Sequence, residues 1–338
     1  MAHITLLAYP GCATSCITGT IDALSIANRW QALIGGEDEK NHPLFHWDIV
    51  SLDGKTVQGD NRITIEPHRS MGDVTTTDLI LIPGFIAPMA FLQSLPEQLI
   101  AWIRAWYGRG AMIAATCTGS FLLAETGLLD GKEATTNWVF ARHFKKRYPR
   151  VHLKPERLLT EDDRLLCTGA TSAYMDLCLY LIKTFGSEEL SATCAKGLLL
   201  ESNRSSQSPF FIFEYYKAHS DPTVLKAQGL MEAHYPGPLS IEAMASELAI
   251  SPRHFVRRFK SATGDTPLAY LQRVRIEAAK QTLEKTSEPI DAITRQVGYE
   301  DTNSFRKLFK KSTGLSPKEY RDRFTRLPNR SRSECAMT

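Results

Sequence analysis

The sequence lacks a long hydrophobic run, a basic leader and paired cysteines, and each absence removes a class of protein. No stretch of the 338 residues approaches the roughly 20 apolar residues that a membrane helix needs. The start, MAHITLLAYPGC, has no basic residues ahead of its apolar stretch and predicts no secretion signal. The seven cysteines, at 12, 16, 117, 167, 178, 194 and 335, are odd in number and lack CxxC spacing, which argues against a disulfide framework or a zinc site. We expect a cytoplasmic protein that uses no metal, no cofactor and no membrane.

The chain as a whole also lacks a strong excess of either charge, because two unlike parts offset one another. Residues 1–220 carry 20 Lys and Arg against 23 Asp and Glu, whereas residues 221–338 carry 20 against 14. The length fits two domains, and 43% hydrophobic residues are enough for ordinary cores. Only the C-terminal part is expected to attract a polyanion such as DNA.

The C-terminal third contains a duplicated segment. SPRHFVRRFKSATG at 251–264 aligns with DTNSFRKLFKKSTG at 301–314 at an offset of fifty residues, while 241–250 aligns with 290–299 at an offset of forty-nine. The extra residue falls at the turn before each shared phenylalanine, where an insertion is tolerated. Each copy predicts a short helix (241–248, 290–297), a turn and a second helix, and 266–285 predicts a helix between the copies.

The second helix of each copy combines a clear start with one basic face. Ser251, followed by Pro252, and Asp301 are the predicted N-caps. If the shared phenylalanines face the core, Arg, Lys and Asn side chains lie on the opposite face of both helices, where they suit contacts to bases and phosphates in the major groove. A single basic stripe is usually only a solvated face, but its duplication favours DNA binding.

The stretch IDAITRQVGYEDTNSFRKLFKKSTGLSPKEYR at 290–321 is typical of one family, and residues 229–326 resemble the DNA-binding domain of AraC/XylS transcription regulators. The resemblance implies double-stranded DNA and RNA polymerase as partners, a homodimer, and activation of transcription. It also implies base-reading residues at Arg253, Val256, Arg257, Thr302, Asn303, Arg306 and Lys307. Val256 departs from a polar reader and could contact a thymine methyl group.

The first two-thirds of the chain predicts an α/β fold. Short β-rich runs at 3–10, 45–52, 78–84 and 111–117 alternate with helix-like segments, which indicates a parallel sheet. In AATCTGSFLLAETGLLDG at 114–131, Cys117 stands between a strand and a helix, as in a nucleophile elbow. Helix amides at such a turn lower a thiol pKa and can bind an anion or a carbonyl group.

Residues 3–200 resemble the class I glutamine amidotransferase-like superfamily, in the branch of the PfpI-type proteases and deglycases. The matching features are YPG at 9–11, IPGF at 82–85, the cysteine turn and GLLDGKEATTNW at 127–138. That branch has a histidine after the cysteine and an acidic residue near the end of the first strand, and here Thr118 and, in our alignment, Cys16 take those places. Because Thr cannot act as a general base, the departure disfavours an enzyme. Together with the C-terminal domain, the resemblance is to the GlxA-like subgroup, in which the former enzyme pocket serves as a sensor.

This resemblance implies a ligand site at the carboxyl ends of the strands, where open α/β sheets bind ligands. The expected residues are Gly84, Phe85, Cys117, Thr118, Asn137, Trp138, Thr171 and Ser172. The effectors implied are amines, amino acids or quaternary ammonium compounds, with Trp138, Phe85 and Tyr174 as possible contacts of a cation.

Other interpretations of these residues stay open. The chain could be a thiol hydrolase or deglycase tethered to DNA, or a redox-sensing regulator that uses Cys12 and Cys16 beside Cys117. Trp138 could be a packing aromatic and Cys117 a small buried hydrophobe.

The predicted organisation has four parts. A flavodoxin-like parallel sheet sandwich of the amidotransferase type spans 1–205, and a linker spans 206–228. An all-α DNA-binding domain with two helix-turn-helix units spans 229–326, and a disordered tail spans 327–338.

Overall fold

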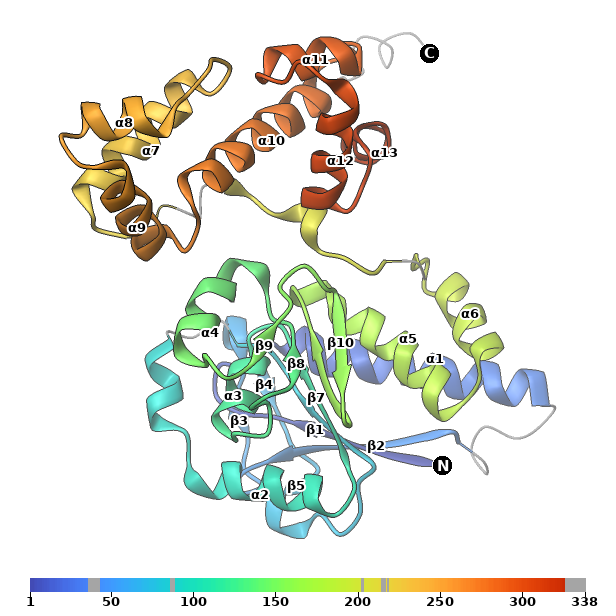
Figure 1. The fold of residues 1–338 in the computed structure, drawn as a ribbon. Coiled ribbons are helices and arrows are strands. Elements are labelled where there is room, and N and C mark those ends of the chain that lie inside the picture. The colour runs from blue at the N-terminus through green and yellow to red at the C-terminus, as the bar shows by residue number, and fades with distance from the viewer. Residues whose placement is uncertain (36–42, 86–88, 202–203, 214–216, 218, 326–338) are drawn as a thin grey trace, which may run out of the picture. The chain divides into compact units, whose positions relative to one another are not determined.

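The computed structural model describes residues 1–35, 43–85, 89–201, 204–213, 217 and 219–325. Its internal contacts divide the chain into an N-terminal unit, Met1–Gln207, and a C-terminal unit, Ser208–Thr338 (Figure 1). No helix in the described ranges is long and apolar enough to span a membrane. The predicted tail at 327–338 lies outside the described residues.

The N-terminal unit is built on a seven-stranded sheet in the order β10-β11-β7-β6-β1-β2-β5. Its strands are β1 (Ala2–Leu7), β2 (Phe45–Ser51), β5 (Arg69–Ser70), β6 (Leu79–Ile82), β7 (Met112–Thr116), β10 (Leu159–Asp162) and β11 (Leu165–Thr168). Neighbouring strands run parallel, except that β10 and β11 are antiparallel. Two short pairs lie outside this sheet, β3 (Val57–Gln58) with β4 (Thr64–Ile65) and β8 (Glu133–Ala134) with β9 (His152–Leu153). Every residue of β6 and β11 is buried, as in parallel sheets that helices cover on both faces.

The described residues of the N-terminal unit also form six α-helices. They are α1 (Thr14–Gly35), α2 (Glu97–Gly108), α3 (Gly119–Glu125), α4 (Ala141–Arg147), α5 (Tyr174–Phe185) and α6 (Glu188–Gly197). Helices α1, α5 and α6 pack on one another, and α2 and α3 pack against β7 (Figure 1). The predicted α/β parallel sheet is confirmed, and the four predicted strands correspond to β1, β2, β6 and β7.

The C-terminal unit is helical, as predicted. Its helices are α7 (Pro222–His234), α8 (Ile241–Glu247), α9 (Pro252–Thr263), α10 (Pro267–Lys285), α11 (Ile290–Gln296), α12 (Thr302–Thr313) and α13 (Pro317–Phe324). They enclose two separate cores, one around Phe255 and Phe259 and the other around Phe305 and Phe309.

Helix α10 belongs to both cores. Tyr270, Leu271 and Val274 in its first half are buried in the first core, and Ile276 and Leu283 in its second half are buried in the second. The first half of α10 is therefore the last helix of the first copy and corresponds to α13 in the second. The second half of α10 is the first helix of the second copy and corresponds to α7 in the first. One rigid helix joins the two helix-turn-helix units.

The predicted linker at 206–228 differs from the structure at both ends. Gln207 is buried in the N-terminal unit, and α7 already begins at Pro222, where Asp221 caps it through hydrogen bonds to the next backbone amides. Val224 and Ala227 are fully buried in the first core. The aspartate-proline pair is a helix start signal, but the apolar residues after it form only a weak stripe, so the sequence pattern predicts a linker over residues 222–228. A DNA-binding fragment that begins at 229 would cut this helix.

Candidate DNA-binding surface and ligand site

The two helix-turn-helix units have the same turn geometry. In each, the second residue after the first helix, Ala249 or Gly298, has a left-handed backbone, and two hydrogen bonds close the turn. The bonds are Ile250 N to Ala245 O and Ala249 N to Ser246 O, both 3.0 Å, in the first unit, and Tyr299 N to Thr294 O at 3.0 Å and Gly298 N to Arg295 O at 3.1 Å in the second. The extra residue of the second copy, Glu300, stands between this turn and the cap of α12.

The second helices begin and end alike. Ser251 caps α9 through a side-chain hydrogen bond to the amide of His254, and Asp301 caps α12 through bonds to the amides of Asn303 and Ser304. Gly264 and Gly314 end the two helices at φ 82° and 78°, left-handed values that glycine adopts without steric strain. Both predicted N-caps are therefore confirmed.

The aromatic cores repeat as well. Phe255 and Phe259 lie 5.7 Å apart between ring centroids, as do Phe305 and Phe309. The hydroxyl of Tyr270 donates to Glu232 at 2.7 Å, and that of Tyr320 donates to Glu284 at 2.8 Å. Because each core holds its helix by the same contacts, the opposite faces of α9 and α12 present side chains in the same way.

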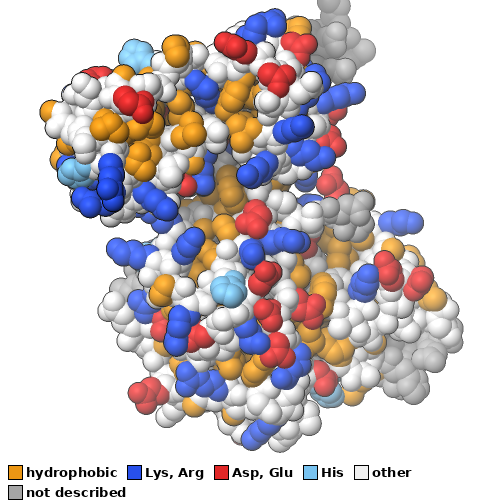
Figure 2. Space-filling model, viewed as in Figure 1, with side chains coloured by type: hydrophobic (Ala, Val, Ile, Leu, Met, Phe, Trp, Pro, Cys, Tyr) orange, Lys and Arg blue, Asp and Glu red, His pale blue; other side chains and the backbone are white. Residues whose placement is uncertain are grey.

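Most of the predicted base-reading side chains are on those exposed faces. Arg253 and Arg257 on α9, and Asn303, Arg306 and Lys307 on α12, are exposed, whereas Val256 and Thr302 are half-buried. Figure 2 shows Lys and Arg side chains gathered over α9. The positions fit the prediction, and the contacts that each residue makes to DNA stay a prediction.

The two faces differ in how far their arginines are already paired. Arg257 has no ion-pair partner among the described residues, while its neighbour Arg258 binds Asp221 at 2.8 Å and holds the cap of α7. This hydrogen bond lowers the pKa of Asp221. On the second helix, Arg306 lies 3.7 Å from Asp291 of α11, and both side chains are at least half exposed. An exposed pair of this kind is weak, so Arg306 can be released to DNA.

Cys117 occupies a strained turn between β7 and α3. Its φ is +53°, a left-handed value that is uncommon for a residue with a Cβ and typical of a nucleophile elbow. Hydrogen bonds fix the turn, because Cys117 N donates to Thr168 O at 3.1 Å and its carbonyl accepts from Ser120 and Thr136. Gly84 packs against it, since a Cβ there would lie 3.0 Å from the Cys117 Cβ. The predicted strand-cysteine-helix turn is present.

Thr118 has a structural role in place of the histidine of the related enzymes. Its hydroxyl accepts a hydrogen bond from Phe85 N and donates one to Phe85 O, both at 2.6 Å, and Thr118 is almost fully buried. Phe85 is buried too, at 3% exposure, so its ring is packed inside the unit rather than presented to a ligand. The expected contact of Phe85 with a bound cation stays a prediction.

The neighbouring cysteines lie in a buried environment. Cys12 and Cys16 are fully buried, and burial raises the pKa of Cys12 to about 11 and also raises that of Cys16. A raised pKa keeps a thiol protonated and unreactive at neutral pH. The arrangement gives no support to a redox couple of Cys12 and Cys16 with Cys117.

Two loops bring polar groups to the Cys117 thiol. Asn137 Nδ2 lies 3.5 Å from the sulfur and Thr171 Oγ1 lies 3.9 Å from it. Among the described residues these are the hydrogen-bond partners of the thiol, and neither is a base. Trp138 and Ser172 follow directly in the chain, at the starts of the short turns η4 (Trp138–Phe140) and η5 (Thr171–Ala173). Asn137 and Thr171 thus meet at Cys117, with Trp138 and Ser172 beside them in the chain and with Thr171 and Ser172 exposed to solvent.

Sequence reasoning missed Gln207, which is buried against both of these loops. Its side chain bonds to Thr136 O and Ala170 N, the residues that precede Asn137 and Thr171. No signal in the sequence pattern identifies it, because its partners are 37 and 71 positions away.

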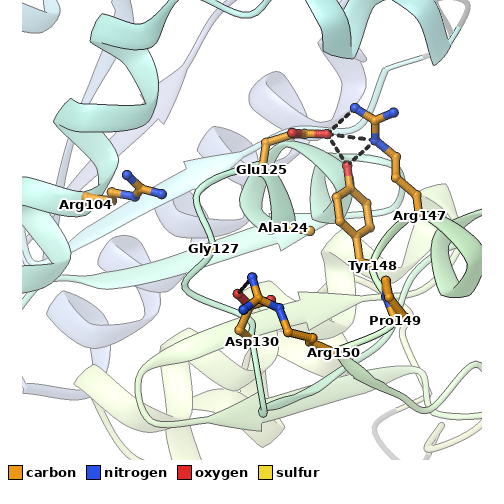
Figure 3. Close-up of a pocket in the computed structure, with 9 residues that line it drawn as sticks. All are labelled: Arg104, Ala124, Glu125, Gly127, Asp130, Arg147, Tyr148, Pro149 and Arg150. Atoms are coloured by element: carbon orange, nitrogen blue, oxygen red, sulfur yellow. Dashed lines mark hydrogen bonds and ion pairs between the residues drawn. The ribbon is translucent and has the colours of Figure 1, made fainter.

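A cavity of about 280 Å³ lies elsewhere in the N-terminal unit, between α2, α3 and α4 (Figure 3). It is lined by Arg104, Ala124, Glu125, Gly127, Asp130, Arg147, Tyr148, Pro149 and Arg150. None of the eight predicted ligand residues lines it. Glu125 is paired with Arg147 and Tyr148, and Asp130 with Arg150, so its acids are already satisfied. Among the described residues, no group of three or more His, Cys, Asp or Glu side chains could hold a metal ion.

Comparison with known families supports the same two-part architecture. Residues 41–184 match the DJ-1/PfpI family and residues 244–323 match a helix-turn-helix domain. The chain is 25% identical to the HTH-type transcriptional regulator GbdR of Pseudomonas aeruginosa, over 88% of this chain and 80% of that protein. It is also 25% identical to CdhR of the same species, over 93% and 90%, and 24% identical to GlxA of Rhizobium meliloti, over 61% and 64%.

Solved structures agree on the fold of the N-terminal unit. A putative transcriptional regulator protein from Vibrio parahaemolyticus matches with a TM-score of 0.52 and 20% identity, over 58% of this chain and 98% of that one. An AraC family regulator from Pseudomonas putida matches with a TM-score of 0.50 and 18% identity, over 59% and 100%. The chain thus combines a DJ-1/PfpI domain with a duplicated helix-turn-helix domain, and it is similar over most of its length to transcription regulators of the AraC family, GlxA among them.

Proposed function

We propose that this regulator binds two successive major grooves of duplex DNA with α9 and α12, and that a small molecule bound at the Cys117 site controls it. The observation that carries the proposal is the repeated geometry of the two helix-turn-helix units, whose equivalent exposed faces carry Arg253 and Arg257 in one and Arg306 and Lys307 in the other. Arginine pairs with guanine in the major groove, and lysine neutralises phosphate. Because the single helix α10 joins the two units, their two faces suit a DNA site that spans both grooves.

The Cys117 site supports binding rather than catalysis. The turn is kept, but Thr118 is engaged with the backbone of Phe85, and the partners of the thiol are an amide and a hydroxyl. A cysteine without a base lacks the usual activation for covalent chemistry. We propose that the N-terminal unit is not an enzyme and that Asn137, Trp138, Thr171 and Ser172 contact the effector together with Cys117.

The family architecture supports a proposal for the effector and for the assembly. We propose an amine, an amino acid or a quaternary ammonium compound as effector, with Trp138 and Tyr174 as aromatic contacts of its cationic group. We also propose that the regulator works as a homodimer in the cytoplasm, where it recruits RNA polymerase and activates transcription.

Selection of duplexes from a randomised library by the full chain tests the DNA-binding part. The selected duplexes should contain two conserved blocks about one helical turn apart, because each helix reads one groove. A single conserved block would mean that only one of the two units reads bases.

A further inference from the structure

The carboxamide of Gln207 joins the two loops of the Cys117 site. Its oxygen accepts a hydrogen bond from Ala170 N at 3.2 Å, and its nitrogen donates to Thr136 O at 2.8 Å. Ala170 immediately precedes Thr171, and Thr136 immediately precedes Asn137, the two residues that contact the thiol. A change in the position of either loop must therefore alter the hydrogen bonds of Gln207.

Gln207 has little freedom to move independently of these loops. Only 2% of its surface is exposed, and its backbone amide donates to Glu156 O at 3.0 Å. The side-chain nitrogen also donates to Pro155 O at 2.8 Å. Gly169 packs so closely that a Cβ there would lie 2.5 Å from the Gln207 side-chain oxygen. A buried amide with this many partners is expensive to displace unless the groups around it move too.

The residues directly after Gln207 belong to the C-terminal unit and pack against its helices. Phe210 contacts Phe324 of α13 at 5.4 Å between ring centroids, and Phe213 contacts Tyr270 of α10 at 5.0 Å. Tyr270 is buried in the first helix-turn-helix core, and Phe324 packs against the second. The segment Ser208–Phe213 therefore contacts both helix-turn-helix units of the C-terminal unit.

Between these two aromatic contacts, a buried lysine holds the backbone of the segment. Lys280 of α10 is 5% exposed, and its ammonium group donates to Phe211 O at 2.6 Å and to Glu277 at 2.9 Å. A buried charge is stable only when it is paired and hydrogen-bonded. Phe211 O is one of those partners, so removing the lysine frees the segment.

We propose that Gln207–Phe213 is a coupling segment that links the occupancy of the Cys117 site to helices α10 and α13, against which the DNA-reading helices pack, with Gln207 and Lys280 as positioning residues. This rests on the proposed function and names its regulatory route. Only Ser208 and Pro209 separate Gln207 from Phe210, so the contacts at the two ends of the segment are close together in the chain. A shift of the loops is passed to α13 and α10.

The coupling can be tested without knowing the effector, because linkage is reciprocal: if the site affects DNA binding, DNA binding must affect the site. The experiment is amide hydrogen exchange of the full chain with and without a duplex that the chain has selected from a randomised library. In the unmodified protein, DNA should change exchange in the loops around residues 134–138 and 168–172 by about 5-fold or more.

Two variants locate the route. Gln207→Ala removes the hydrogen bonds to the two loops in the N-terminal unit. Lys280→Met removes the hydrogen bond to Phe211 O in the C-terminal unit and leaves the loops unchanged. Both should bind the duplex but lose its effect on the loops. Gln58→Ala and Lys285→Met, at exposed positions away from the segment, should keep it. Lys280→Met also guards against the case in which Gln207→Ala loosens the loops by itself.

The outcomes separate the coupling from the DNA binding on which it rests. If the unmodified chain binds duplex DNA and the loops do not respond, or if they respond equally in both segment variants, the coupling segment is refuted while DNA binding stands. If the full chain selects no duplex at all, the proposed function fails and the coupling fails with it.

Discussion

Ala249 and Gly298 occupy the same position in two copies of one turn, and both have left-handed backbones, at φ 54° and 84°. The surroundings differ. A Cβ on Gly298 would lie 2.6 Å from Pro236 O and 3.0 Å from the Arg275 guanidinium, whereas the first unit already carries a Cβ at this place. The duplicated turn is therefore strained in the first copy and crowded in the second.

The two exchanges at this turn should have opposite effects on stability. Ala249→Gly removes a left-handed alanine, which should raise the free energy of unfolding by up to about 1 kcal/mol after the extra entropy of glycine is deducted. Gly298→Ala should lower it by about 2 kcal/mol or more, because the Cβ meets a backbone oxygen. Thermal unfolding of both variants measures this. Equal and small shifts for both would show that the second turn is not crowded.

Thr118 should prove to be a structural residue rather than a replaced catalytic one. Thr118→Val keeps the shape but leaves the N–H and C=O of Phe85 without their hydroxyl partner, at a cost of about 1–3 kcal/mol. Thr118→Ser retains the hydroxyl and should cost much less. Thermal unfolding measures the difference, and equal stability of the two variants would contradict the structural role of the Thr118 hydroxyl.

Replacement of Cys117 distinguishes binding from thiol chemistry. A thermal-shift screen of the full chain with amines, amino acids and quaternary ammonium compounds should find a compound that raises the Tm, because a ligand stabilises the state that it binds. The same compound should raise the Tm of Cys117→Ser, which lacks a thiol but has nearly the same size. It should not raise that of Cys117→Trp, whose indole fills the space between Asn137 and Thr171. Loss of the shift in a folded Cys117→Ser variant would mean that the thiol itself reacts.

The buried thiol of Cys12 predicts a loss of stability at alkaline pH. Burial raises its pKa from the ordinary 9.0 to about 11, so the folded chain holds the proton more tightly than the unfolded chain. This contribution is fully present below pH 9 and is lost as the pH rises from 9 through about 11, with a size on the order of 2 kcal/mol. Cys12→Ala should show a shallower decline over that range in urea titrations. An unchanged slope would mean that Cys12 is not buried in solution.

The sequence predicted the architecture well where residue patterns repeat. The offset between 251–264 and 301–314 placed both N-caps and the inserted residue correctly, because local hydrogen bonds and helical spacing determine these features. The strands rich in β-branched and aliphatic residues were also found. The strands β10 and β11 were missed, since LTED and LLCT are too short to show a periodicity and are stabilised by pairing with each other and with β7.

The remaining differences come from tertiary contacts. α7 has a capping signal at Asp221 and Pro222 but little amphipathic pattern, and its assignment depends on the core formed with α9 and α10. Gln207 and Lys280 owe their roles to carbonyl groups 50 to 71 residues away, a distance at which no spacing rule applies. The hydrogen bonds between Thr118 and the backbone of Phe85 also join residues 33 positions apart, so no local pattern indicates them.

The most direct test of DNA reading by both helices is the affinity of Arg257→Ala and Lys307→Ala for a duplex selected by the full chain. Both residues are exposed on the face opposite a buried phenylalanine pair, so each substitution should leave thermal unfolding unchanged. Arg257→Ala should weaken binding by about 5- to 150-fold, the loss expected for one guanine contact, and Lys307→Ala should weaken it and reduce its salt dependence. Lys285→Ala, at an exposed position near the end of α10, should bind like the unmodified chain. Unchanged affinity of both variants at matched salt would contradict the assignment of α9 and α12 as the DNA-reading helices.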